Sequence, residues 1–156
     1  MSLPDLQTLA HTQLPAAWAA RTEPDALPPA FVAARSLQQI AQGKPAQWCH
    51  GFLVLRAADQ HIVGACGFKH TPQDGRVEIG YGIAPGCRGQ GAASAAVRQL
   101  LELAFAGGAS GAREVLAEVR PDNEASARVV QRLGFVALDT RVNEDGETVR
   151  QWLARP

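Results

Sequence analysis

The sequence predicts a mixed α+β fold in which a mostly antiparallel sheet is covered by helices. Two apolar runs, at 48–57 and 61–69, are joined by the short connection Ala58-Asp59-Gln60, which is typical of an antiparallel hairpin. Two further strand patterns, at 76–83 and 114–120, are each followed by a helix pattern. An antiparallel meander that leads into one strand–helix unit and then a second is typical of the α+β class.

Length and composition predict one globular domain over residues 1–156. Hydrophobic residues make up 46% of the chain and charged residues 19%, which excludes a disordered chain. Fifteen Lys and Arg balance fifteen Asp and Glu, so no overall field would recruit nucleic acid or an anionic membrane. No apolar run approaches the ~20 residues that span a bilayer. A signal peptide carries basic residues before its apolar region, and this N-terminus has none there. We therefore expect a cytoplasmic protein.

The first third of the chain carries the weakest patterns. Five prolines within residues 1–29 interrupt any long helix. There we predict a short extended piece near 6–9 and a helical turn at 16–20. Apolar residues at helical spacing then predict a helix over 30–42 that Gly43 ends.

The strand pattern over 76–83 alternates between an apolar face and a face of small residues. The apolar positions are Val77, Ile79, Tyr81 and Ile83. The other face carries Glu78 with Gly80 and Gly82. Glycines at these positions leave a groove instead of a packed layer, so the Glu78 carboxylate can face a ligand. The alternative is an exposed strand glutamate without a role.

A glycine-rich loop follows this strand and opens a long helix. Arg88 to Ala93 reads RGQGAA, and such small side chains let a ligand approach the backbone closely. N–H groups at the start of a helix bind anions, most often phosphates; the alternative is a plain glycine-containing turn. No lysine follows the glycines, which excludes a P-loop, and the spacing of Gly86, Gly89 and Gly91 excludes a dinucleotide fingerprint. Gly107-Gly108 is predicted to end the helix.

A second strand–helix unit and a hairpin complete the chain. After the strand at 114–120, Asn123 is a typical N-cap residue and Gly134 a typical C-terminal glycine, so these residues bound a helix. The stretches 135–141 and 147–153 then predict a closing hairpin.

Three sequence blocks resemble the GNAT superfamily of acyl-CoA N-acyltransferases. The loop at 88–93 is similar to the Arg/Gln-x-x-Gly-x-Gly/Ala loop of that family. The stretch 121–135, PDNEASARVVQRLGF, is similar to its Asn-x-x-Ser helix that ends in Leu-Gly-Phe. EIGY at 78–81 is similar to the ribosomal-protein N-terminal (alanine) acetyltransferase branch. The resemblance covers residues 48 to 153.

The resemblance implies a GNAT-like fold and an acetyl-CoA site. The expected sheet is twisted, mostly antiparallel and of six to seven strands, is flanked by about four helices, and splays between the strands at 76–83 and 114–120. The opening would let the pantetheine arm of acetyl-CoA bond to the backbone there. The implied cofactor-binding residues are Tyr81, Ile83, Arg88, Gly89, Gln90, Gly91, Ala92, Ala93 and Asn123. Acetyl-CoA would be a co-substrate, and no metal is expected.

Catalytic roles are implied by the same resemblance. Glu78 would act as general base, directly or through water, and remove a proton from the substrate amine. Ser126 would protonate the departing thiolate, because the tyrosine often found further along that helix in the family is absent. A thiol of pKa ~8.5 leaves readily as the thiolate, so a dedicated acid would contribute little. For Asn123, capping the helix is a sufficient alternative role.

The implied activity is transfer of an acetyl group from acetyl-CoA to a primary amine by direct attack in a ternary complex. The acceptor is a protein N-terminus or a small-molecule amine, and its binding walls are expected from the N-terminal third and the hairpin loops. A non-catalytic acyl-CoA-binding sensor or scaffold is the alternative. Exposed sheet edges predict a homodimer. The cysteines Cys49, Cys66 and Cys87 match no zinc or redox spacing, and we expect no acyl-cysteine.

Overall fold

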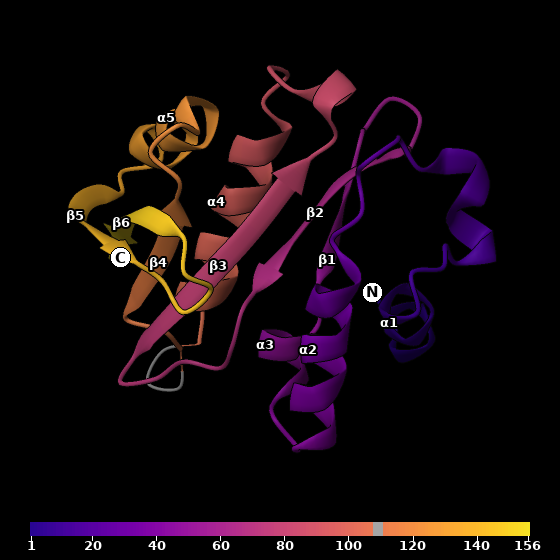
Figure 1. Cartoon of the computed structure of the whole chain (residues 1–156), viewed down its shortest axis with the longest axis horizontal. Helices are drawn as coiled ribbons and strands as arrows, with labels where there is room; N and C mark the ends of the chain where they lie inside the picture. The colour runs from indigo at the N-terminus through magenta and orange to yellow at the C-terminus, as the bar shows by residue number, and fades with distance from the viewer. Residues whose placement is uncertain (108–110) are drawn as a thin grey trace.

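The computed structural model describes residues 1–107 and 111–156. Its strands are β1 (Phe52–Leu55), β2 (Ile62–Phe68), β3 (Arg76–Ile83), β4 (Glu114–Val119), β5 (Val136–Val142) and β6 (Thr148–Ala154). They form one sheet in the order β1-β2-β3-β4-β6-β5 (Figure 1). The pair β3–β4 is parallel and the other pairs are antiparallel. The predicted α+β fold with a mostly antiparallel sheet is confirmed.

Helices flank this sheet on both sides. Within the described residues they are α1 (Leu3–Ala10), α2 (Ala30–Ala41), the single turn α3 (Ala46–Cys49), α4 (Ala92–Phe105) and α5 (Glu124–Arg132), with 3-10 segments η1 (Ala16–Arg21) and η2 (Pro85–Cys87). Figure 1 shows α4 behind β3, and α1 and α2 beside the β1–β2 hairpin. The buried side chains form two clusters, one that joins α4 and α5 to the centre of the sheet and one around α1 and α2.

The extended piece expected near 6–9 is wrong, because these residues belong to α1. Ser2 and Asp5 form a capping box that starts the helix. Leu6 and Leu9, three positions apart, lie on its buried face. So short a stretch of apolar spacing does not separate one helical turn from a short strand.

The first apolar run is also divided between two elements. Trp48 belongs to α3, which follows Pro45, and β1 begins only at Phe52. The Trp48 ring packs edge-on against Phe68 with the ring centroids 4.8 Å apart. The apolar residues of the run indicate that both α3 and β1 contribute to the core. They do not indicate that the chain changes direction between the two elements. The predicted helix over 30–42 and the helical turn at 16–20 are confirmed by α2 and η1.

β3 and β4 diverge halfway along their length. Their pairing runs from Arg76 opposite Glu114 to Ile79 opposite Ala117, whereas β3 continues beside β2 to Ile83. The predicted splay is therefore confirmed. The last residues of β3, beyond Ile79, are unpaired on the side that faces β4.

Backbone groups of β3 point into this opening. Lys69 N–H donates to Glu78 O at 2.8 Å, so the even-numbered residues of β3 bond to β2. Because hydrogen-bonding direction alternates along a strand, the N–H and C=O groups of odd-numbered residues point the other way. Beyond the last β3–β4 pair these are the groups of Tyr81 and Ile83, which face the splay.

Two further features are absent from the described residues. No helix in residues 1–107 and 111–156 is long and apolar enough to cross a membrane. In the same residues no group of three or more His, Cys, Asp or Glu side chains could hold a metal ion. The cytoplasmic location stays a prediction. The helix after the glycine-rich loop ends at Phe105, and Gly108 of its predicted end lies outside the described residues.

Candidate functional site

Two cavities meet at the splay. One, of about 640 Å³, lies between the glycine-rich loop and α5, and we call it the loop cavity. The other, of about 590 Å³, lies between the α2 region and the β5–β6 turn, and we call it the hairpin cavity. The residues that line both are Tyr81, Gly82, Ile83, Arg88 and Arg120. Ligands in the two cavities would therefore meet at the open end of β3.

The glycine-rich loop presents backbone N–H groups to the loop cavity. Gly89 and Gly91 have φ of 76° and 83°, values that residues other than glycine rarely adopt. The first helical bond of α4 runs from Ala95 N–H to Gly91 O at 3.0 Å, so the preceding N–H groups have no acceptor within the helix. Ala92 and Ala93, which carry two of these groups, line the cavity. The backbone of the loop therefore has the geometry that the predicted anion site requires.

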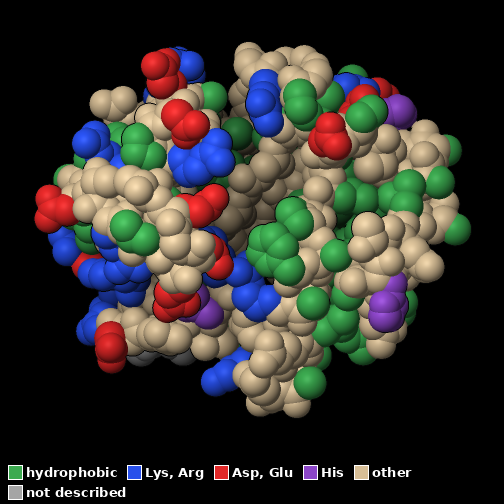
Figure 2. Space-filling model, viewed as in Figure 1, with side chains coloured by type: hydrophobic (Ala, Val, Ile, Leu, Met, Phe, Trp, Pro, Cys, Tyr) green, Lys and Arg blue, Asp and Glu red, His purple; other side chains and the backbone are tan. Residues whose placement is uncertain are grey.

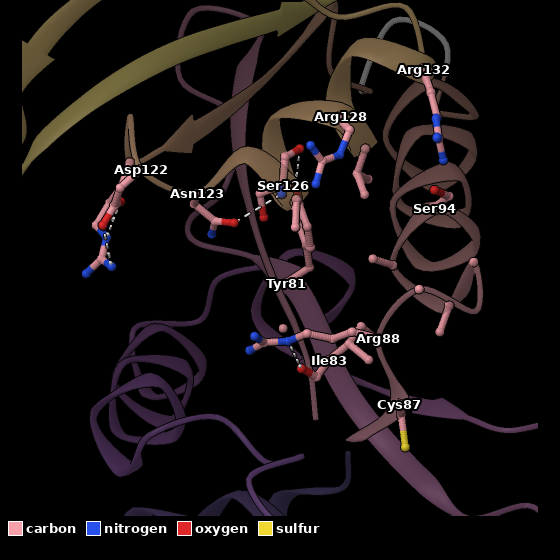
Figure 3. A pocket seen from close by; sticks show the side chains of 18 residues that line it. Tyr81, Ile83, Cys87, Arg88, Ser94, Asp122, Asn123, Ser126, Arg128 and Arg132 are labelled. Atoms are coloured by element: carbon pink, nitrogen blue, oxygen red, sulfur yellow. Dashed lines mark hydrogen bonds and ion pairs between the residues drawn. The ribbon is translucent and has the colours of Figure 1, made fainter. Parts of the chain in front are cut away.

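Most of the predicted cofactor-binding residues line this cavity. They are Tyr81, Ile83, Arg88, Gly89, Gly91, Ala92, Ala93 and Asn123. Gln90 belongs to the same loop but is exposed and lines neither cavity. Arg88 turns back across the open end of β3, where its Nε donates to Ile83 O at 3.1 Å (Figure 3). The loop and the end of β3 are thus joined by a side chain that carries positive charge.

The first turn of α5 forms the opposite wall of the loop cavity. Asn123 caps this helix as predicted, since its Oδ1 accepts the Ser126 N–H at 3.1 Å. The Tyr81 hydroxyl donates to Ser126 O at 3.4 Å (Figure 3). Burial raises the pKa of Tyr81, which outweighs the opposite effect of the hydrogen bond, so the phenol keeps its proton. The Tyr81 hydroxyl therefore lies beside the backbone of Ser126, whose residue lines the same cavity.

The sequence predicts Tyr81 as a cofactor-binding residue and Ser126 alone as the acid. Strand alternation does place Tyr81 on the opposite face from Glu78. The alternation does not reveal that α5 packs near that face. This contact joins Tyr81 to Ser126, which are 45 positions apart in the chain.

Glu78 forms an ion pair with the Lys69 Nζ, and its side chain is 15% exposed. Gly80 and Gly82, on the same strand face, line the hairpin cavity, whereas Glu78 lines neither cavity. A general base must reach the proton that it takes, directly or through one water. Glu78 thus lies two residues before Gly80, the nearest residue of β3 that lines the hairpin cavity, and its charge is paired with that of Lys69.

A second carboxylate, which the sequence analysis missed, lines the hairpin cavity at the splay. Glu118 is 5% exposed, and its Oε1 accepts from Gln151 Nε2 at 2.9 Å and pairs with Arg141 Nε at 3.4 Å. These two partners from β6 and β5 fix its position. An acidic residue within the apolar strand EVLAEV was the signal that could have identified it, because it shares the sheet face of Glu78.

The hairpin cavity has an apolar side and a charged side. The apolar wall comes from the segment before α2 and from α2 itself, and includes Leu27, Pro28, Pro29, Phe31 and Val32. The acidic residues of the lining are Asp25, Glu118, Asp145 and Glu147, and the basic ones are Arg35, Lys69, Arg88 and Arg120. Figure 2 shows the hollow in this face, with charged side chains gathered on the half that carries β4, β5 and β6.

The loop cavity, in contrast, is strongly cationic. Its described lining contains one acidic residue, Asp122, although the whole chain has a formal net charge of zero. The basic residues are Arg88, Arg120, Arg128 and Arg132. A cavity that combines free helix N–H groups with four guanidinium groups favours a ligand with several negative charges.

Comparison with known families identifies the fold. A family model described as the acetyltransferase (GNAT) domain matches residues 2–136. The chain therefore belongs to the GNAT acetyltransferase family, and the resemblance inferred from the three sequence blocks is confirmed.

One curated relative supports this assignment. The uncharacterized N-acetyltransferase p20 of Bacillus licheniformis is 32% identical over 84 residues, which are 53% of this chain and 46% of the relative. The match thus spans about half the length of that protein.

Solved structures share the fold at low sequence identity. The ribosomal-protein-S5-alanine acetyltransferase from Vibrio fischeri superposes with a TM-score of 0.69 at 19% identity, over 99% of this chain and 90% of that one. RimL, a ribosomal L7/L12 alpha-N-protein acetyltransferase in complex with coenzyme A, gives a TM-score of 0.61 at 20% identity, over 81% and 70%.

Proposed function

We propose that residues 1–156 act as one domain that transfers an acetyl group from acetyl-CoA to a primary amine. The observation that carries this proposal is the meeting of two cavities at the open end of β3. One cavity suits a polyanionic donor, and the other has a buried carboxylate and room for an acceptor. Membership of the GNAT family supports the same activity. Direct attack then needs only that the two ligands meet in a ternary complex.

The donor would lie along the loop cavity. Its pyrophosphate would bind the N–H groups at the start of α4, and its pantetheine arm would bond to the outward-facing backbone of Tyr81 and Ile83. The Ile83 N–H is the proposed donor to the thioester oxygen, where negative charge develops during attack.

The chemistry requires a neutral amine and a good leaving group. The amine nitrogen forms a bond to the thioester carbon, the bond from that carbon to sulfur breaks, and the amine loses a proton while the sulfur leaves as thiolate. The thioester is already activated, so positioning and removal of the amine proton are the main tasks of the protein.

Two carboxylates are candidates for the base. We propose that Glu118 takes the proton directly, because it is buried, fixed by two partners and part of the cavity wall at the splay. Glu78, the residue implied by the family resemblance, would act through a water, since Lys69 pairs with it and Gly80 stands between it and the cavity.

For the departing thiolate, we propose protonation by Ser126 or Tyr81. Ser126 lines the loop cavity beside the cap of α5, and the Tyr81 hydroxyl, kept protonated by its raised pKa, lies at the same turn. Because a thiolate of pKa ~8.5 is a stable leaving group, either hydroxyl would contribute modestly.

The proposed acceptor is a protein N-terminus or a small-molecule amine. The ribosomal-protein acetyltransferases among the similar folds support the first. Individual carboxylates in the lining of the hairpin cavity, such as that of Glu118, could pair with the amine of either kind of acceptor. A mass-spectrometric assay with acetyl-CoA and matched acceptors tests this. The panel would pair peptides with a free N-terminus against the same peptides with a blocked N-terminus and a lysine, and add polyamines and amino acids.

The proposal predicts an acetylated product from at least one class in this panel. Binding of acetyl-CoA without turnover of any amine would instead favour the non-catalytic sensor. Failure to bind acetyl-CoA at all would overturn both readings.

We also propose that two chains associate through β5, as the exposed sheet edge predicts. β5 is one of the two edge strands of the sheet, and every one of its residues is exposed. Val136 and Val142 are 66% and 65% exposed, and the register shift between Ala137 and Thr140 places them on opposite faces of the strand. Pairing of two such edges would cover the unpaired backbone of both strands. Light scattering that shows a monomer at micromolar concentration would overturn this.

A further inference from the structure

The basic side chains that line the hairpin cavity differ in whether they have a partner. Lys69 forms an ion pair, Arg88 donates to a backbone carbonyl, and Arg120 forms an ion pair at 3.3 Å. The remaining basic residue of the described lining is Arg35 of α2. Its guanidinium has no hydrogen-bond or ion-pair partner in the part of the chain that the structure describes.

Arg35 is also half-buried, which makes a missing partner costly. A charged group that is withdrawn from water loses free energy of hydration unless another group replaces it. The lining carboxylates that lack a partner among the described residues are those of Asp25, Asp145 and Glu147, and all three are exposed, so water solvates them. Arg35 is therefore the charge of this cavity that gains most from a bound ligand.

A hydroxyl group accompanies this guanidinium. Ser36 is polar but only 8% exposed, and its side chain likewise has no partner in the described residues. Val32, Arg35 and Ser36 are three or four positions apart or adjacent on one side of α2, and all of them line the cavity. A guanidinium and a hydroxyl both donate hydrogen bonds, so together they suit an anionic group with more than one oxygen.

An open floor separates these donors from the buried carboxylate of Glu118. The floor is the face of β2 and β3 on which Gly67 lies opposite Gly80 and Ala65 opposite Gly82. Figure 1 shows α2 on the β2 side of β3 and β4 on the other side. Because adjacent strands are about 4.8 Å apart, β2 and β4 are separated by about 10 Å. The cavity can thus hold an anionic group at one wall and an amine at the other.

We propose that the acceptor is a small primary amine that also carries a carboxylate, and that Arg35 and Ser36 bind the carboxylate while Glu118 faces the amine. The inference rests on the proposed function and names the substrate class of that same site. A planar carboxylate accepts two parallel bonds from a guanidinium fork. The apolar wall of the hairpin cavity would pack against the aliphatic part of the acceptor. A protein N-terminus has an amide in place of this carboxylate and would leave the Arg35 charge unpaired.

Three acceptor pairs test the proposal: leucine and leucinamide, phenylalanine and phenylalaninamide, and 6-aminohexanoate and its amide. The members of a pair differ in the pKa of the amine, so the quantity to compare is the effect of a substitution on each member. Arg35→Gln should lower kcat/KM for the carboxylates of at least one pair by about 10- to 100-fold, mainly through KM, and change the amides by less than about twofold. Retained turnover of the amides also shows that the variant is folded.

Two further variants sharpen this result. Ser36→Ala should lower kcat/KM for the carboxylates by about two- to tenfold, because it removes one neutral hydrogen bond. Arg35→Lys keeps the charge without the planar fork, so it should retain part of the preference. Arg98→Gln is the matched control, because Arg98 is an exposed arginine of α4 that lines neither cavity. It removes the same charge and should affect both members of each pair equally.

The outcomes separate this inference from the proposed function. An Arg35→Gln variant that loses the same factor on both members of every pair would overturn the inference, and so would acetylation that is confined to peptides and uncharged amines. Both results would leave the acetyltransferase activity itself intact. If the unmodified protein acetylates no amine at all, the proposed function fails, which is a distinct result.

Discussion

The loop cavity and the hairpin cavity are of similar volume but are assembled in different ways. The loop end of the loop cavity comes from one short segment, residues 88–94 without Gln90, and its far wall is mostly α5. The hairpin cavity draws on segments from the N-terminus, α2, β2, β3, β4 and the β5–β6 turn. A site made by one loop is encoded locally, whereas a site made by many segments depends on the whole fold.

This difference explains what a sequence can reveal about each half of the reaction. Backbone N–H groups at a helix start need only glycine and other small residues at fixed spacing, so the proposed donor site has a pattern that is visible in the sequence. The acceptor site uses ordinary side chains at scattered positions, and no spacing rule joins them. The proposed functions of the two cavities can therefore be tested separately, by variants that disable one and spare the other.

The largest expected effect is the loss of donor binding in Gly91→Glu. The new carboxylate would stand at the anion site, and the φ of 83° at this position disfavours any side chain. We expect acetyl-CoA affinity to fall by about 3 kcal/mol or more, which is over 100-fold. Calorimetry measures this. Gly86→Glu is the control, since Gly86 lies just before the loop, has open space around it and lines neither cavity.

An unchanged affinity in Gly91→Glu would show that the loop is not the pyrophosphate site. An equal loss in Gly86→Glu would point to a general effect of added negative charge. Circular dichroism of both variants separates these outcomes from a loss of folding.

The fold and most of the residues that line the loop cavity were predictable from the sequence. For the hairpin cavity the sequence indicated only the contributing segments, the N-terminal third and the hairpin loops, and not the individual side chains. The order of strands and main helices from Phe52 onward and the cap of α5 follow from local patterns, whereas the splay was implied by the resemblance to the GNAT superfamily. The helix α1 was missed because a capping box at Ser2 and Asp5 outweighs the weak apolar signal after it. Glu118 was missed because its importance comes from β6 and β5, whose side chains Gln151 and Arg141 hold it at the splay.

The next effect in size is expected for the two carboxylates of the acceptor side. Glu118→Gln keeps the shape and removes the base, so kcat/KM at neutral pH should fall by about 10²-fold, the lower end of what a general base contributes, with acetyl-CoA affinity unchanged. Glu78→Gln should cost less, because this residue would act through a water and lines neither cavity. Steady-state kinetics of both variants, measured side by side, give the comparison. A larger loss in Glu78→Gln would reverse the assignment of the direct base.

The pH dependence of this loss separates proton removal from positioning. An alkylamine of pKa ~10.4 is only about 0.04% neutral at pH 7, whereas an α-amine of pKa ~7.7–8 is about 10–20% neutral. The deficit of Glu118→Gln should therefore shrink between pH 7 and 10 as the free amine becomes abundant, and it should be larger for an alkylamine acceptor. A deficit that stays constant over this range would mean that the carboxylate only positions the acceptor.

A smaller effect is expected for the hydroxyl groups on the donor side. Ser126→Ala and Tyr81→Phe should each lower kcat by less than about tenfold, because the thiolate leaves readily. Burial raises the pKa of Tyr81 above its usual value near 10, so its proton stays in place and activity should not fall through loss of that proton below pH 10. Rate profiles of the single and double variants check this. Abolition of turnover by either single change would make that hydroxyl essential and contradict the account.

The smallest effect is expected for Cys87→Ala. This variant tests whether the amine in one cavity attacks the thioester in the other directly. Cys87 lines the loop cavity, but it is 5% exposed and its Sγ accepts from Arg56 Nη1 at 3.6 Å. Cys66, which lines the hairpin cavity, has a pKa raised by burial to about 11, so at neutral pH it is a thiol and a poor nucleophile. Turnover of Cys87→Ala should thus stay within about twofold, with a loss of stability of ~1 kcal/mol from the removed sulfur. Intact-protein mass spectrometry after mixing with acetyl-CoA alone completes the test. An acetyl group found on any cysteine would replace direct attack by a two-step transfer, and the two cavities would then act in sequence through that cysteine.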